Sequence, residues 1–287
     1  MLTIYKKQLQ KTWLFWIIPV ALLVAMALLV VGIWPDYEPV MKEFETIFAE
    51  NPLFSSLLGE SSMGSFEGFI SVEMFIVADF IFMGLIVLVG TMVIAWEADS
   101  GTLDVILSYP IPRWKFLSQK LLAIITLSFS FPVLVWGAIA VAAAVMNIEF
   151  KQDAFLIAIL GKWIVYMAFT CITILCSVIF MDTTKTLGSA GLIVGGSWIF
   201  ERFGGLIRTA NEQIADILQG VSLFHYIDGQ AVMNTLMDNE ASLIIPINDL
   251  NLVFIYPVHE LALVLIIGIA ALLAALFLFQ KREFTYI

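Results

Sequence analysis

The segment from Trp13 to Trp34 reads WLFWIIPVALLVAMALLVVGIW and contains no charged residue. A lipid bilayer has a hydrocarbon core about 30 Å thick, which an α-helix crosses in about 20 residues. The segment therefore predicts a membrane-spanning helix. It is too long for the apolar part of a cleavable signal, and no small-residue cleavage site follows it, so we expect it to stay in the protein.

Five further apolar runs of comparable length predict five more spans. The six predicted spans are residues 13–34, 77–96, 121–146, 155–181, 187–207 and 261–279. Hydrophobic residues make up 61% of the chain and charged residues only 13%, whereas soluble domains are about half apolar and about a quarter charged. The runs are too continuous for the alternating strands of a β-barrel. We therefore predict an all-α membrane protein, with residues 1–287 forming one transmembrane domain.

The positions of lysine and arginine predict the orientation, because cytoplasmic loops are enriched in both. If both termini are cytoplasmic, that side holds most of the 14 basic residues, namely Lys6, Lys7, Lys11, Arg113, Lys115, Lys120, Lys185, Lys281 and Arg282. Acidic residues concentrate in two loops on the opposite face, Pro35–Ile76 and Arg208–Glu260. We expect a multi-pass protein of the cytoplasmic membrane with both termini in the cytoplasm. The net charge of −10 argues against a nucleic-acid partner.

Two further segments predict helices at the membrane surfaces. Residues 1–13 suggest a separate amphipathic helix on the inner surface, with Leu2, Ile4, Tyr5 and Leu9 in lipid and the lysines facing phosphates. The last external loop holds apolar residues at helical spacing, and these are Ile214, Ile217, Leu218 and Val221. We expect a short helix there, lying at the outer surface or dipping into it.

The segment Trp96–Lys120, WEADSGTLDVILSYPIPRWKFLSQK, is the longest polar break between apolar runs in the first half of the chain. Gly101 can adopt the left-handed conformation that closes a helix, and Thr102 is a suitable N-cap for a new one. Asp104 in its first turn suits the helix dipole. Three apolar residues then share one helical face, namely Leu103, Ile106 and Leu107. Pro110 and Pro112 end the helix.

This short helix has two interpretations. It is either a charged connector or a docking element that presents its apolar face to a cytoplasmic protein. The second interpretation predicts that Leu103→Asp or Leu107→Asp abolishes partner binding and leaves membrane insertion intact. Beyond the helix, Arg113, Lys115 and Lys120 are expected to meet anionic lipid headgroups before the third span.

The same stretch resembles the signature of ABC-2-type permeases, the membrane subunits of ATP-binding-cassette exporters. The matching residues are Glu97, Gly101, Thr102, Leu103, Asp104, Leu107, Ser108, Pro110, Ile111, Arg113 and Lys120. The predicted topology, with six spans and a long last external loop, is also similar to that family. The resemblance implies that Thr102–Tyr109 is a coupling helix, seated in a groove of an ATPase subunit.

The resemblance further implies an assembly of two permease copies, identical or related, with two copies of an ABC ATPase. No G-x-x-x-x-G-K-[ST] phosphate-binding motif occurs in this chain. ATP and Mg²⁺ are therefore expected in the ATPase, and no cofactor in this chain. No metal site is expected, because His225 and His259 are separated in the sequence, and Cys171 and Cys176 suit buried packing positions.

By the same resemblance, the second and fifth spans line the translocation path. The candidate residues are Asp79, Phe80, Met83 and Ile86 in the second span and Gly191, Gly195, Glu201 and Arg202 in the fifth. Gly191 and Gly195 form a GxxxG pair, which suits close packing within one subunit or with another. Glu201 and Arg202 predict a local or interfacial pair, with an external gate as the alternative. The apolar lining favours a lipophilic cargo over a sugar.

Two other functions compete with transport. A membrane-embedded enzyme would need a nucleophile and base or paired acids at bilayer depth, and the chain has no H-E-x-x-H or G-x-S-x-G motif. A sensory or scaffold subunit would dock the same ATPase without moving cargo. Only a transport measurement separates that function from export.

Overall fold

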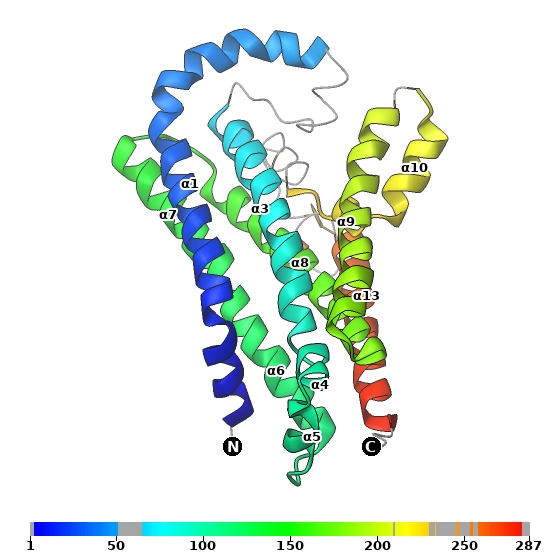
Figure 1. Cartoon of the computed structure of the whole chain (residues 1–287). Helices are drawn as coiled ribbons and strands as arrows, with labels where there is room; N and C mark the ends of the chain where they lie inside the picture. The colour runs from blue at the N-terminus through cyan, green and yellow to red at the C-terminus, as the bar shows by residue number, and fades with distance from the viewer. Residues whose placement is uncertain are drawn as a thin grey trace.

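The structure is a computed structural model that describes residues 3–50, 65–208, 210–229, 233, 245–246, 253–254 and 258–282. In chain order the helices are α1 (Thr3–Glu50), α3 (Phe66–Thr91), α4 (Ala95–Asp99), α5 (Thr102–Leu107), α6 (Arg113–Ser128), α7 (Ser130–Met146), α8 (Gln152–Phe180), α9 (Thr183–Ile207), α10 (Glu212–Val221), α11 (Leu223–Tyr226) and α13 (Val258–Lys281) (Figure 1). The strands β1 (Ile245–Pro246) and β2 (Val253–Phe254) form a short antiparallel pair. The body of the protein is helical, as predicted.

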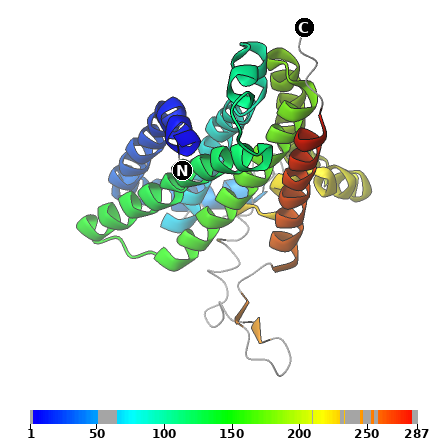
Figure 2. The same ribbon diagram turned by 90° about the horizontal axis from the view of Figure 1, so that it is seen from below.

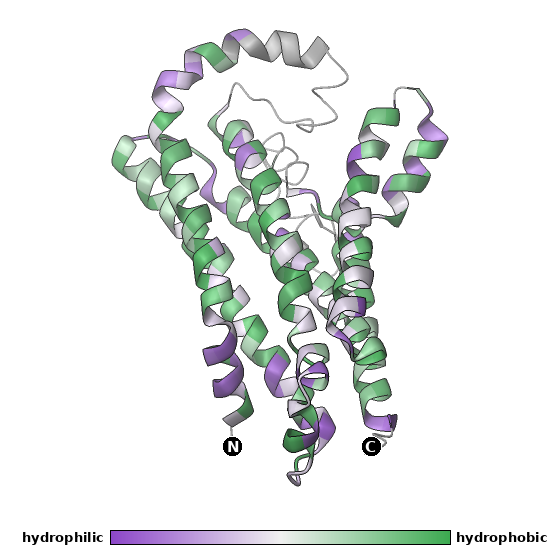
Figure 3. Cartoon of the chain, in the orientation of Figure 1, coloured by the Kyte–Doolittle hydropathy of each residue, from purple (hydrophilic) through white to green (hydrophobic). Residues whose placement is uncertain are grey.

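Five of the described helical segments are long and apolar enough to cross a bilayer. They are Thr3–Met41, Phe66–Thr91, Arg113–Met146, Gln152–Phe180 and Glu260–Lys281, and they correspond to five of the six predicted spans. Figure 3 shows hydrophilic residues gathered mainly toward the ends of these helices. The helix predicted at 187–207 is present as α9, but Lys185, Glu201 and Arg202 together with its glycines lower its hydropathy. Its membrane crossing stays a prediction.

Helix α8 is the centre of the bundle, because it packs against α3, α7, α9 and α13. Helices α1 and α13 lie on opposite sides of the molecule in both ribbon views (Figures 1 and 2). The chain begins and ends at the same end of the bundle (Figure 1), as the predicted topology requires. We call this end of the bundle the termini end.

Helix α1 corrects the prediction of a separate amphipathic helix over residues 1–13. The chain is one continuous helix from Thr3 through the predicted span to Glu50. Its first turns pack against α6 rather than lying on lipid: Gln8 and Thr12 are buried, and the Tyr5 hydroxyl donates to Thr126 at 3.3 Å. Because these polar residues are buried against α6, the first turns do not need to lie along the membrane surface, and the helix continues directly into the span. Leu2 lies outside the described residues.

The second span ends earlier than predicted, at Thr91 rather than near Trp96. The ends of a helix leave backbone N–H and C=O groups without hydrogen-bond partners inside the helix. Here side chains from other helices provide those partners. The Ser177 hydroxyl of α8 accepts a hydrogen bond from the Ala95 amide at 2.7 Å. The Lys120 ammonium of α6 donates to the Val93 carbonyl. These two contacts stabilise the turn that leads into α4.

The predicted helix of the last external loop is confirmed as α10. The Asn211 side chain caps it by accepting a hydrogen bond from the Ile214 amide at 3.1 Å. A Cβ atom at Gly204 would come within 2.5 Å of the Gln219 side chain, so a glycine here lets α10 pack closely on α9. Ile214, Ile217 and Val221 remain exposed. Residues 51–64 and most of 230–257, which belong to the two predicted external loops, lie outside the described residues.

Candidate functional site

The segment predicted to be a coupling helix folds as two short helices, α4 and α5, joined at Gly101. Gly101 has a φ of +68°, the left-handed conformation that the sequence predicted. Gly101 itself, rather than Thr102, is the N-cap residue of α5. The Thr102 hydroxyl instead donates to the Glu97 carbonyl at 3.2 Å, so it satisfies the end of α4. Because Gly101 is the last residue before the helix, α5 already begins at Thr102, and Thr102 is therefore a helical residue rather than the N-cap.

The apolar face of α5 points into its own chain, contrary to the predicted orientation. Leu103 is only 1% exposed and belongs to the hydrophobic core, and Ile106 and Leu107 are half-buried against that core. The opposite face is the accessible one, with Val105 63% exposed. Asp104, Ser108 and Pro110 are also exposed. We call the surface formed by Asp104, Val105 and Ser108 the outer face of α5.

Glu97 links α4 to two other helices through ion pairs. Its side chain is buried and forms ion pairs with Lys11 of α1 at 3.5 Å and with Lys120 of α6. Lys120 is also buried and lies over the Phe116 ring. Lys120 was predicted to lie among lipid headgroups at the membrane surface, but it is paired inside the protein, because the buried carboxylate of Glu97 requires a countercharge close by.

Arg113 connects the segment to the C-terminal helix. Its guanidinium donates to the carbonyls of Phe279 at 3.1 Å and Gln280 at 3.3 Å. It thus caps the last turn of α13, where unpaired carbonyls favour a cation. Arg282 acts in the same way on α8, donating to the Val178 and Ile179 carbonyls at 2.7 Å each. Arginine caps therefore join α6, α13 and α8 at the termini end.

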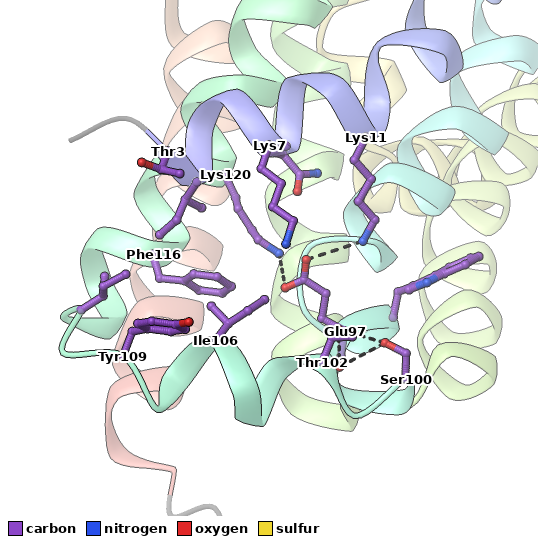
Figure 4. A pocket seen from close by; sticks show the side chains of 14 residues that line it. Thr3, Lys7, Lys11, Glu97, Ser100, Thr102, Ile106, Tyr109, Phe116 and Lys120 are labelled. Atoms are coloured by element: carbon purple, nitrogen blue, oxygen red, sulfur yellow. Dashed lines mark hydrogen bonds and ion pairs between the residues drawn. The ribbon is translucent and has the colours of Figure 1, made fainter.

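A cavity of about 670 Å³ lies between α1, the α4–α5 segment and α6. Lys7 and Lys11 come from α1, Glu97 from α4 and Lys120 from α6 (Figure 4). Its other walls are largely apolar and include Ile106 and Phe116. We call it the termini-end cavity.

A second polar cluster is buried in the middle of the bundle, and the sequence analysis did not find it. Lys162 of α8 donates to both carboxylate oxygens of Asp79, at 3.2 and 3.1 Å. The Tyr166 hydroxyl donates to Asp79 Oδ1 at 2.8 Å. All three side chains are buried. The sequence does contain a feature that could have predicted this cluster. Asp79 is the only charged residue in one predicted span and Lys162 the only one in another, and charges at bilayer depth pair with each other.

The four candidate path residues of α3 do not share one surface. Asp79 and Ile86 are buried inside the subunit. Phe80 is exposed and its ring lies 4.6 Å from that of Trp198 on α9, and Met83 is half-buried. Of these four residues, Phe80 is the one exposed on the surface of the subunit, and it lies beside α9.

Gly191 and Gly195 of α9 lie on an open surface. A Cβ atom at Gly191 or Gly195 would meet no atom within 4 Å, and Leu192 between them is exposed. Packing within the subunit, the alternative for the GxxxG pair, therefore has no support among the described residues.

Glu201 pairs with the α10–α11 segment. Its carboxylate lies 3.3 Å from His225 Nδ1 and accepts from the Gln219 amide at 3.4 Å. The hydrogen bond to Glu201 raises the pKa of His225 and outweighs the lowering effect of burial. Arg202 lies over the Trp198 ring at 5.8 Å. The predicted partner of Glu201 was Arg202, and sequence proximity could not reveal His225 because α10 must first fold back on α9.

Among the described residues, no group of three or more His, Cys, Asp or Glu side chains is placed to hold a metal ion. The sequence model of a family described as "ABC-2 family transporter protein" matches residues 2–284. No curated protein and no solved structure matches the chain.

Proposed function

Because the chain belongs to the ABC-2 family of transporter proteins, we propose that it is the permease subunit of an ATP-driven exporter and that a separate ATPase docks on the outer face of α5. One observation carries this proposal. At the termini end, Val105 is exposed on one face of a short helix, whereas Leu103 on the other face is anchored in the core. An exposed apolar residue on a firmly anchored element suits contact with a partner protein.

The contacts behind α5 support a role in transmitting force. Glu97 links α4 to α1 and α6 through Lys11 and Lys120, and Arg113 links α6 to the end of α13. A push on α5 would therefore reach three membrane-spanning segments together. Rigid-body tilting of helices about an interface is an established way to switch between two states, and here it would alternate access to the path.

The open face of α9 supports a second permease copy. Gly191, Gly195 and the exposed Leu192 offer a surface on which another helix can approach closely. Phe80 lies against Trp198 of α9 and is the path residue that a partner copy would help to enclose. In this assembly two permeases, identical or related, bind two ATPases, which hold ATP and Mg²⁺. Both termini of each permease lie in the cytoplasm.

The test is a pull-down of the tagged chain from native membranes in mild detergent, with identification of bound proteins by mass spectrometry and a vanadate-sensitive ATPase assay. We expect Val105→Asp to abolish recovery of the ATPase. Val221→Asp is the matched control, because Val221 is equally apolar and similarly exposed on α10, and it should retain the ATPase. Equal recovery with both variants would refute docking at α5. A bound ATPase without cargo-dependent turnover would identify a sensory or scaffold subunit instead.

A further inference from the structure

The termini-end cavity lies at the end of the bundle where two of the candidate membrane-spanning segments begin. It is lined by the first turns of α1 and α6, two of the segments apolar enough to cross a membrane. Trp13, Trp96 and Trp114 are all exposed toward this end of the bundle, and tryptophan is enriched at the boundary between hydrocarbon and water. A lipid molecule of the adjacent leaflet can therefore reach the cavity with its headgroup.

The charge of the cavity is positive. Three lysines, Lys7, Lys11 and Lys120, line it together with one acid, Glu97. Lys11 and Lys120 share the Glu97 carboxylate. Lys7 has no ion-pair partner among the described residues, and both Lys7 and Lys11 repel the ammonium of Lys120. An anion in the cavity would relieve this repulsion.

Gln8 provides an independent sign of a missing ligand. Its side chain is 2% exposed and lines the cavity, yet its Nε2 donates to no acceptor in the described part of the protein. Buried polar groups are almost always hydrogen-bonded, and an unused donor is costly. An acceptor oxygen held in the cavity would satisfy it.

The walls define the rest of the ligand. Trp96, Ile106, Ile111 and Phe116 supply apolar surface beside the lysines. A small hydrated anion gains nothing from such walls, whereas a phosphate attached to a hydrocarbon stem uses both the charge and the apolar surface.

We propose that the termini-end cavity binds the phosphate group of an anionic phospholipid from the leaflet at the termini end. Lys7, Lys11 and the Gln8 amide bind the phosphate oxygens, and the apolar walls hold the glycerol and the first acyl methylenes. The lipid bridges α1 and the α4–α5 segment, so its occupancy stiffens the attachment of α5 to the bundle. The site does not depend on the identity of any docking partner.

The test measures lipid binding to the purified, delipidated protein by native mass spectrometry, with phosphatidylglycerol, with phosphatidylcholine of the same acyl chains, and with inorganic phosphate. We expect preferential retention of one phosphatidylglycerol and roughly tenfold weaker retention in Lys7→Gln, as suits the loss of one charged hydrogen bond. Lys6→Gln removes the same charge from the same helix outside the cavity and should change nothing. Equal loss in the two variants, or equal binding of the two lipids, would overturn the proposal. Competition by inorganic phosphate at the affinity of the lipid would show a phosphate site and overturn the lipid assignment.

Gln8→Leu separates ligand binding from a structural role. Replacing an unsatisfied buried amide by an apolar side chain of similar size should leave the melting temperature of the lipid-free protein unchanged or higher. The same variant should bind phosphatidylglycerol more weakly. Unchanged binding by Gln8→Leu would place the phosphate elsewhere and refute the site.

Discussion

Asp79 and Lys162 are the residues on which the interior of the bundle depends most directly. Asp79 is the only charged residue of the predicted span 77–96, and Lys162 is the only one of the predicted span 155–181. Each is buried with the other as its counterion. Removing one partner leaves the other charge buried and uncompensated, whereas removing both leaves an apolar contact. The pair is therefore interpreted as a structural link between α3 and α8, since neither side chain reaches an exposed surface.

This interpretation predicts a particular pattern of stability. Lys162→Met should lower the free energy of unfolding in detergent by about 3–5 kcal/mol, and the double variant Asp79→Leu/Lys162→Met should recover most of that loss. Lys185→Met is the control, because Lys185 is an exposed lysine in a surface pair. The measurement is denaturant unfolding followed by tryptophan fluorescence. A double variant as unstable as the single one would contradict a simple ion pair.

His225 makes the packing of α11 on α9 dependent on pH. The Glu201 hydrogen bond raises the pKa of His225 above its ordinary value of 6.5. The stabilisation is therefore complete below about pH 6.5 and is lost as pH rises through the folded-state pKa. We expect the melting temperature to fall over that window, and Glu201→Gln to flatten the dependence. A profile that is the same in the wild type and in Glu201→Gln would show that the pair contributes nothing.

At the scale of the element, α5 differs from its predicted role in one respect. The pattern Leu103, Ile106, Leu107 predicted an apolar face correctly, but the pattern alone cannot tell whether that face meets a partner or the protein's own core. Burial of Leu103 decides it, because a face used to hold α5 in place is not available for docking. The accessible surface is the outer face of α5.

The two faces of α5 should respond differently to the same substitution. Leu103→Asp introduces a charge into the core, so we expect a loss of folded protein in detergent rather than a selective loss of partner binding. Val105→Asp changes an exposed position and should leave the melting temperature within a few degrees of wild type. Size-exclusion chromatography and thermal unfolding measure both. A folded, stable Leu103→Asp protein that fails to bind the ATPase would restore the predicted orientation.

At the scale of the whole molecule, the proposed second copy would pack on the open face of α9. Gly195→Leu should weaken dimerisation without unfolding the subunit, because nothing lies within 4 Å of an added Cβ. Gly32→Leu is the matched control, since Gly32 of α1 is equally open and lies on another helix. The mass of the particles in nanodiscs or detergent measures the outcome. Dimers of equal stability in both variants would exclude this face as the interface.

The sequence by itself determined the class of protein and the positions of most helices. Long uncharged runs have no stable state in a bilayer other than a helix whose backbone is fully hydrogen-bonded, so their location follows from composition. The left-handed turn at Gly101 was also predictable, because it depends on local geometry.

Only the tertiary structure decided how the polar residues are used. Asp79 pairs with Lys162, and Glu97 pairs with Lys11 and Lys120. Glu201 pairs with His225. In each case the partner lies on another helix. The continuous α1 and the inward face of α5 were decided in the same way. These outcomes depend on which helices pack together, because a buried charge or apolar face takes its partner from its neighbours in space, and periodicity along one helix carries no information about them.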